Sequence, residues 1–218
     1  DKLICASNDN KVLYDFFTTG TYDRKRDFIL TNSPSMDILI SSNLERLIYL
    51  SAGCDASVSA ALMRELSEKG CYTVTDEMRR FMEDFVGGYA DQKQNADTIR
   101  RIFKDTGYLV DTHTGVAAAV YYDYANRTGD TAKTVIASTA SPFKFSRSVM
   151  EAVQGAGENG NADETAAMDE FAVVDALSSL SGVPVPQAVE EIRTAHIRHN
   201  LECDVDRMKD TVKGILKI

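Results

Sequence analysis

Short apolar runs alternate with longer stretches of helical spacing along the first 150 residues. Uniform apolar runs of this length are typical of strands buried on both faces of a parallel sheet. The three clearest runs are Leu3–Ala6, Tyr108–Val110 and Thr134–Ala137. Polar loops follow all three, and helical spacing follows the first two, where Asn8–Asn10 is predicted to cap the first helix. The pattern therefore predicts an α/β fold up to about residue 150.

Residues 55 to about 106 place apolar side chains at helical spacing, which predicts a helical insertion in this α/β region. Asp55 is placed to cap the first of three expected helices, and Gly70 is placed to end it. The pair Gly87–Gly88 is predicted to end the second helix, and the third is expected around Thr98–Asp105.

The chain changes character after about residue 150. Gly155–Asn161 is rich in glycine and asparagine and is interpreted as a linker. The segments beyond it are predicted to be helical, over Glu164–Leu180, Val185–Ala195 and Asp204–Leu216. We therefore expect two regions, an α/β region over 1–150 that includes the insertion at about 55–106, and a helical region over 151–218.

Composition excludes several classes of protein. The net charge of -9 and the pI of about 4.9 argue against a general nucleic-acid surface, because phosphate backbones require clustered Lys and Arg. No apolar run approaches the ~20 residues of a membrane helix, and no secretory leader is visible, so a cytoplasmic protein is expected. The chain opens directly on a strand-like run, which leads us to expect a fragment whose fold begins upstream.

Cysteine and histidine spacing offers no metal set. The four cysteines are widely separated and are expected to be reduced, mostly buried thiols. His196 and His199 share one helical face at most, with no nearby cysteine or carboxylate to complete a site. We interpret both histidines as surface residues and expect no bound metal.

Candidate chemistry gathers after the predicted strands, because ligands of open α/β sheets bind beyond the carboxyl ends of the strands. Asp111–Thr114 places hydroxyls and an imidazole at a helix start, and Ser138–Ser141 offers three hydroxyls. Ser41–Arg46 adds polar groups at another helix start, where Arg46 suits a phosphate. Each pattern also has a plainer interpretation, as helix caps and, for Arg46, as an ion pair with a surface acid such as Glu45.

Two linked motifs carry a family resemblance. Ser33–Ile38 followed by Ser41–Arg46 reads SPSMDI-x-x-SSN-x-ER, and with it the chain resembles the threonine synthases that have a long helical insertion. Further agreement lies at Asn8–Gly20, Gly107–Val116 and Ala137–Phe145. The chain departs from the family at Thr112, where proline is usual, and at Ser141, where histidine is frequent.

The resemblance implies a fold and a reaction. The fold is part of the large domain of a fold-type II pyridoxal-phosphate enzyme, mainly a parallel sheet flanked by helices, with a helical insertion and a helical C-terminal tail. The reaction converts O-phosphohomoserine and water into threonine and phosphate. The Schiff-base lysine and the phosphate loop of the cofactor would lie upstream, in the N-terminal half of the same chain. We therefore expect no catalytic residue here, and neither activity nor bound cofactor in this chain alone.

By the same resemblance, Thr139 is the first choice, with Ser138, for the residue that contacts the pyridine nitrogen of the cofactor. Ser42, Asn43, Arg46 and His113 would line or support the substrate pocket. Two alternatives stay open. In the first, the chain is part of a noncatalytic threonine-synthase-like binding protein. In the second, it is part of a related phospho-lyase that acts on another phosphorylated substrate.

Overall fold

The computed structural model describes residues 1–155 and 162–218 as a mixed α/β structure that is mostly helical. The predicted linker at Gly155–Asn161 therefore lies, except for Gly155, outside the described residues. The chain divides into two compact units, Asp1–Val185 and Pro186–Ile218. Each unit is described by itself.

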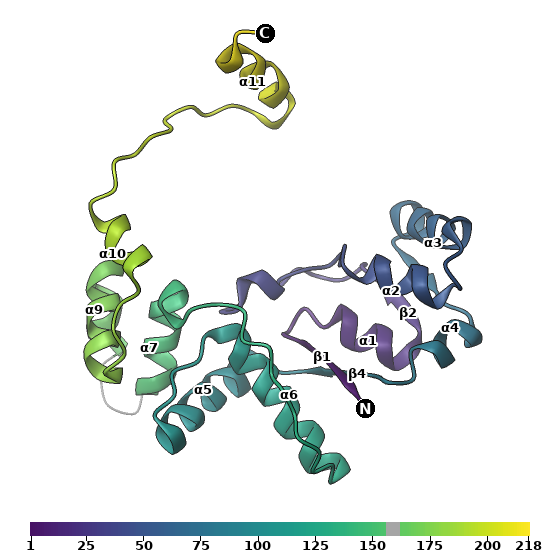
Figure 1. The fold of residues 1–218 in the computed structure, drawn as a ribbon, viewed down its shortest axis with the longest axis horizontal. Helices are drawn as coiled ribbons and strands as arrows, with labels where there is room; N and C mark the ends of the chain where they lie inside the picture. The colour runs from purple at the N-terminus through teal and green to yellow at the C-terminus, as the bar shows by residue number, and fades with distance from the viewer. Residues whose placement is uncertain (156–161) are drawn as a thin grey trace. The chain divides into compact units, whose positions relative to one another are not determined.

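In the residues that the structure describes, the first unit contains four short strands among its helices (Figure 1). Its elements in chain order are β1 (Leu3–Ser7), α1 (Val12–Thr19), β2 (Thr21–Asp23), η1 (Pro34–Met36), α2 (Leu44–Ser51), α3 (Ala56–Lys69), β3 (Cys71–Thr73), α4 (Asp76–Phe81), β4 (Phe85–Tyr89), α5 (Gln92–Thr106), α6 (Thr112–Thr128), η2 (Pro142–Phe145), α7 (Ser146–Gln154), α8 (Ala162–Ala167) and α9 (Glu170–Ser181).

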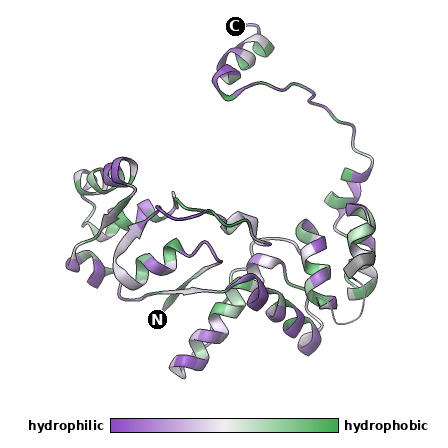
Figure 2. Cartoon of the chain, turned by 180° about the vertical axis from the view of Figure 1, so that it is seen from behind, coloured by the Kyte–Doolittle hydropathy of each residue, from purple (hydrophilic) through white to green (hydrophobic). Residues whose placement is uncertain are grey.

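The second unit contains α10 (Gln187–Arg193), η3 (Val205–Arg207) and α11 (Met208–Leu216), and no residue of these three elements is fully buried. Figure 2 shows that apolar and polar residues alternate around the helices of both units. In the first unit this alternation places apolar side chains such as Ile48, Ile99 and Val149 in the core, where all three are 0% exposed.

Two parallel strands, β1 and β4, form the sheet that positions the candidate site. Leu3 pairs with Phe85 and Ser7 with Tyr89. Successive residues of a strand point to opposite faces, and a Cβ added at Gly87 would meet Tyr14 of α1, whereas one at Gly88 would meet Val120 of α6. Helices α1 and α6 therefore cover the two faces of this sheet. A second, antiparallel pair joins β2 and β3.

The main hydrophobic core lies around α1, the β2–β3 pair, α2 and α4. Phe16 of α1 is 1% exposed, and its ring lies 6.0 Å from that of Tyr22 and 6.1 Å from that of Tyr72. The Tyr22 and Tyr72 rings stack with their centroids 5.4 Å apart. Aromatic burial of this kind contributes more than its area alone, and it fixes α1 against the β2–β3 pair.

The stretch 55–106 is less helical than its apolar spacing predicts, because it contains β3 and β4 as well as three helices. Gly87 and Gly88 lie inside β4 and do not end a helix. Both positions need glycine because α1 and α6 approach the strand so closely: the Cβ added at Gly88 would lie 2.3 Å from Val120 Cγ1. Helix α4 ends earlier, at Phe81.

The predicted strands at Tyr108–Val110 and Thr134–Ala137 do not form. Leu109 and Val110 are buried, yet they belong to no ladder in the described part of the chain. Thr134–Ala137 has no regular secondary structure, pairs with no strand among the described residues, and leaves Val135 94% exposed. An apolar run forms a strand only when another strand supplies the hydrogen bonds.

The structure also tests the predicted caps and bounds of single helices. Asp55 caps α3 by accepting from the Ser57 and Val58 amides, and Gly70 ends this helix at a φ of +77°, both as predicted. Glu164–Leu180 is divided into α8 and α9, because the Asp169 side chain caps a new helix start. Helices α10 and α11 confirm the last two predicted helical segments, with shorter bounds.

Two predictions from residue type are wrong. The side chains of Asn8 and Asn10 do not cap α1, whose N-cap residue is Lys11. The cysteines are not mostly buried: Cys54 and Cys203 are exposed, and Cys5 and Cys71 are half-buried. Burial raises the pKa of the Cys5 thiol to about 11, so this residue is a poor nucleophile near neutral pH.

Candidate functional site

The N-terminus of α6 is organised by one buried carboxylate. Asp111 is 0% exposed and caps the helix: its Oδ1 accepts from the His113 amide at 2.8 Å and from His113 Nδ1 at 2.9 Å. Its Oδ2 accepts from the Thr114 hydroxyl. Because a carboxylate only accepts, His113 carries its proton on Nδ1. The Nε2 atom is then left to accept a hydrogen bond.

His113 Nε2 accepts a hydrogen bond from the segment that precedes α2. The backbone N–H of Ser35, in η1, donates to His113 Nε2 at 3.1 Å. The imidazole ring also lies 4.7 Å from the ring of Phe145, which follows the Ser138–Ser141 hydroxyls in the chain. His113 therefore joins three segments that are distant in the sequence, the SPSMDI motif, the start of α6, and η2.

The charge of Asp111 is stabilised by its hydrogen bonds. Burial alone would raise the pKa of this carboxyl group, but the hydrogen bonds from His113 and Thr114 outweigh burial and hold the pKa below its ordinary value. Asp111 is thus a carboxylate in the folded protein at neutral pH. It orients its two partners and has no oxygen directed at a ligand.

The hydroxyls of Ser138 and Thr139 differ in their hydrogen bonding. Ser138 Oγ lies 2.9 Å from Thr114 Oγ1, so Ser138 is linked to Asp111 through Thr114. The Thr139 hydroxyl makes no hydrogen bond to any residue that the structure describes. Thr139 is therefore the hydroxyl that is available to a ligand.

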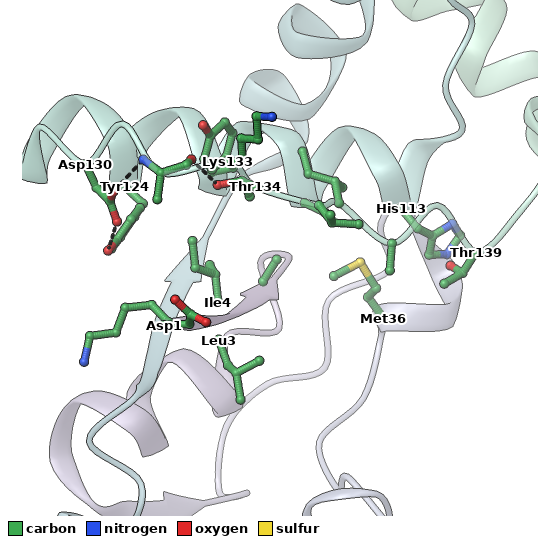
Figure 3. A pocket seen from close by; sticks show the side chains of 18 of the residues that line it. Asp1, Leu3, Ile4, Met36, His113, Tyr124, Asp130, Lys133, Thr134 and Thr139 are labelled. Atoms are coloured by element: carbon green, nitrogen blue, oxygen red, sulfur yellow. Dashed lines mark hydrogen bonds between the residues drawn. The ribbon is translucent and has the colours of Figure 1, made fainter.

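Thr139 and His113 line one end of a cavity of about 800 Å³, within the size range of cofactor sites. Figure 3 shows these two residues beside each other, near Met36, with Lys133 and Asp130 toward the opposite end. The long walls are mainly apolar and come from β1, from the Ala132–Ala137 segment and from one face of α6. The cavity thus combines an apolar body with a small polar end.

A buried polar network that the sequence analysis did not predict supports the loop that His113 holds. Asp37 Oδ1 accepts from Asn8 Nδ2 at 2.7 Å, from Asn10 Nδ2 at 3.0 Å and from Thr31 Oγ1 at 2.7 Å. Asn8 and Asn10 are 2% and 3% exposed. The sequence contains a signal for this network, because three polar residues, Asn8–Asn10, directly follow a strand and need hydrogen-bond partners at the carboxyl end of the sheet.

The structure does not bring Ser42, Asn43 and Arg46 to this cavity. Ser42 and Arg46 line a separate groove of about 560 Å³ between α2 and α3, together with Glu45, Tyr49 and other residues. Asn43 is the N-cap residue of α2, but its side chain bonds no backbone N–H and accepts from Arg46 Nη2 instead. Of the six predicted site residues, His113, Ser138 and Thr139 lie together and these three lie apart from them.

The described residues offer neither a metal site nor a membrane-spanning helix. Within residues 1–155 and 162–218, no three His, Cys, Asp or Glu side chains are arranged to hold a metal ion. His196 and His199 are exposed, as predicted. None of the described helices has the length and apolar character needed to cross a bilayer.

Comparison with known families gives one match, to the model for the C-terminal region of threonine synthase, over residues 114–195. Human threonine synthase-like 1 is 38% identical over 156 residues, which cover 70% of this chain and 20% of the relative. Threonine synthase from Saccharomyces cerevisiae is 31% identical over 170 residues, which cover 71% of this chain and 33% of the relative. The chain therefore spans about a fifth to a third of the length of these relatives.

Solved structures that resemble the chain include two threonine synthases. The pyridoxal-phosphate-bound threonine synthase from Brucella melitensis is 30% identical, with a TM-score of 0.64 over 83% of this chain and 40% of that one. The yeast threonine synthase structure is 24% identical, with a TM-score of 0.75 over all of this chain and 42% of that one. The second likeness shows that the fold matches part of threonine synthase.

Proposed function

Because this chain is homologous to the C-terminal region of threonine synthase, we propose that it forms one wall of the cofactor pocket of a pyridoxal-phosphate-dependent enzyme. The whole enzyme would convert O-phosphohomoserine and water into threonine and phosphate. In this proposal residues 1–150 are the C-terminal half of a fold-type II large domain, and 151–218 are its helical tail. The N-terminal part of the enzyme supplies the lysine and the phosphate loop.

The free hydroxyl of Thr139 is the observation that carries the proposal. The pyridine nitrogen of the cofactor needs one hydrogen-bonding partner, and a neutral hydroxyl suits a ring nitrogen that is not held protonated. Thr139 lines the cavity, whereas the carboxylate of Asp111, at the start of α6, is occupied by His113 and Thr114. The residues present therefore fit the ring side of pyridoxal phosphate. When bound, this cofactor supplies the electron sink of the reaction.

The neighbouring residues position Thr139 and the loop opposite it. Asp111 orients Thr114, which holds the Ser138 hydroxyl and so fixes the backbone that carries Thr139. His113 uses Nε2 to hold the Ser35 amide, so this atom is not free to take a proton from a substrate. His113 in this proposal supports the pocket and does not act as its base.

Ser42, Asn43 and Arg46 are proposed as substrate contacts with less structural support. An arginine suits the phosphate of O-phosphohomoserine because its guanidinium group can donate two parallel hydrogen bonds. In the described residues, however, Arg46 donates to Asn43 and lines its own groove. The motif favours these residues and the geometry does not bring them to Thr139, so the proposal does not depend on them.

A second candidate function has a specific observation behind it. The chain is 38% identical to human threonine synthase-like 1 and 31% identical to the yeast threonine synthase. The match to a relative that is named separately from threonine synthase supports, as the alternative, a threonine-synthase-like protein that binds a ligand without forming threonine. Thr139 would then still contact a bound ring, but no product would form.

Substitution of Thr139 tests the proposed role directly. In the complete polypeptide that contains this chain, Thr139→Val keeps the shape of the side chain and removes its hydroxyl. We expect threonine formation from O-phosphohomoserine to slow about ten- to hundredfold, which corresponds to the loss of one hydrogen bond of about 1–3 kcal/mol, while the cofactor stays bound. Thr18→Val is the matched control, because Thr18 lies outside the cavity and its hydroxyl donates to the Tyr14 carbonyl within α1. Unchanged kinetics in Thr139→Val would remove Thr139 from the site.

A further inference from the structure

The groove of about 560 Å³ between α2 and α3 is not needed by the proposed function, and its size lies within the range of small-molecule sites. The two helices lie side by side (Figure 1). Along α2 the lining changes from charged to apolar: Glu45 and Arg46 lie in the first turn, and Tyr49 and Leu50 lie one turn later. The groove therefore has a charged end and an apolar body.

The charged end carries one unpaired charge of each sign. Glu45 and Arg46 both line the groove, yet neither forms an ion pair with a residue that the structure describes. The ion pair between them, which was the plainer interpretation of the sequence, is thus not made. Arg46 donates to the Asn43 side chain and keeps other N–H groups for a ligand. A molecule with one carboxylate and one ammonium group would neutralise both charges.

A buried hydroxyl in the α3 wall also lacks a partner. Ser59 lines the groove and is only 6% exposed. Its hydroxyl makes no hydrogen bond to any residue that the structure describes. Buried polar groups are normally hydrogen-bonded, so this hydroxyl is left for a molecule that occupies the groove.

We propose that this groove binds a free α-amino acid with an apolar side chain. Arg46 would bind its carboxylate and Glu45 its ammonium group, while Ser59 can donate to the first or accept from the second. The side chain of the amino acid would lie against Tyr49 and Leu50. Binding here does not depend on whether the complete protein forms threonine.

The charge of the groove argues against a phosphorylated amino acid. Arg46 is the only cation among the described residues that line the groove, and the ligand's own carboxylate would occupy it. A phosphate group would then lie near Glu45 without a cation to neutralise it, and like charges repel. The groove therefore favours an amino acid such as leucine over O-phosphohomoserine.

Leucine binding to the complete polypeptide tests the site. Alanine methyl groups are labelled with ¹³C, and the NMR signals of Ala56 and Ala60, which both line the groove, are followed during titration. We expect saturable shifts with leucine. The analogues 4-methylpentanoate, which lacks the ammonium group, and isopentylamine, which lacks the carboxylate, should each bind at least about tenfold more weakly, because each leaves one charge unpaired.

Variants of α3 locate the binding in the groove. Ala60→Leu fills the groove and should abolish the shift of the Ala56 signal. Ala61→Leu is the matched control, because Ala61 is exposed on the same helix and does not line the groove, so its dissociation constant for leucine should stay within about twofold of wild type. Ser59→Ala, which removes only the hydroxyl, should weaken leucine binding about three- to tenfold.

Four outcomes would overturn the proposal. No saturable shift up to about 10 mM leucine would show that the site does not exist, since even a site of millimolar affinity would then be nearly full. Equal binding of leucine and 4-methylpentanoate would show that the groove does not recognise both charges. Leucine binding that Ala60→Leu leaves unchanged would place the ligand elsewhere. Tighter binding of O-phosphohomoserine than of leucine at these two methyl groups would assign the groove to the substrate of the proposed reaction.

Discussion

Asp111 joins residues that lie far apart in the chain, and it does so with hydrogen bonds at both carboxylate oxygens. Through His113 it reaches Ser35, and through Thr114 it reaches Ser138. The sequence motif Asp-Thr-His-Thr indicates polar groups at a helix start, but it does not indicate which of them face a ligand. The structure separates supporting residues from the residue available to a ligand. Asp111 and His113 are hydrogen-bonded to other protein groups, whereas the Thr139 hydroxyl has no hydrogen-bond partner among the described residues.

Asp111→Asn should lower stability and change its dependence on pH. The substitution removes the charge that two side chains and one amide stabilise, at a cost of about 1–3 kcal/mol near pH 7. The folded pKa of Asp111 is below its ordinary value, so the unfolded state takes up the proton first as pH falls. The contribution of this carboxylate is therefore present above about pH 4, the ordinary value for Asp, and is lost as pH falls through the folded pKa.

Urea unfolding of this chain between pH 7 and pH 3 measures both effects. Asp123→Asn is the matched control, because Asp123 lies on the same helix, is 74% exposed and pairs only with Arg127 at 3.7 Å. The control should change the free energy of unfolding by less than about 0.5 kcal/mol. Equal stability of Asp111→Asn and wild type at pH 7 would contradict the role given to Asp111.

At the scale of elements, local signals were readable from the sequence and pairing was not. Asp55 and Gly70 bound α3 as predicted, because a cap and a left-handed C-terminal residue depend on neighbouring residues alone. The pair Gly87–Gly88 was interpreted as a helix end but lies inside a strand. Glycine is needed there because α1 and α6, which are distant in sequence, pack closely against the two faces of the strand. Thr134–Ala137 has the composition of a strand, but no strand among the residues that the structure describes pairs with it.

The crossing of α5 and α6 depends on a glycine in the middle of a contact. A Cβ added at Gly115 would lie 2.2 Å from Asn95 Oδ1 and 2.7 Å from Ile99 Cγ1, and both of these residues are 0% exposed. Gly115→Ala should therefore destabilise the chain by about 1–2 kcal/mol, because overpacking outweighs the better helix propensity of alanine.

Gly214→Ala in α11 gives the matched comparison, because no atom lies within 4 Å of a Cβ added at Gly214. This variant should keep or slightly raise the helix content, because alanine is favoured over glycine in a helix by roughly 1 kcal/mol of free energy. Thermal unfolding followed by circular dichroism measures both variants. A Gly115→Ala protein as stable as wild type would show that α5 and α6 pack less closely than described.

At the scale of the whole molecule, the same features support two functions that differ in outcome. The family match at residues 114–195 and the likeness to solved threonine synthases relate the chain to threonine synthase, and the identity of 38% relates it also to human threonine synthase-like 1. The sequence motifs predicted the family. They did not separate these two functions.

Product formation by the complete polypeptide is the most direct test of the proposed function. The protein is supplied with pyridoxal phosphate and O-phosphohomoserine, and phosphorus NMR and amino-acid analysis follow phosphate and threonine together. The proposal predicts that one threonine forms for each phosphate released. Intact O-phosphohomoserine in the presence of bound cofactor would contradict the proposal in favour of a threonine-synthase-like protein, and phosphate without threonine would contradict it in favour of a different phospho-lyase.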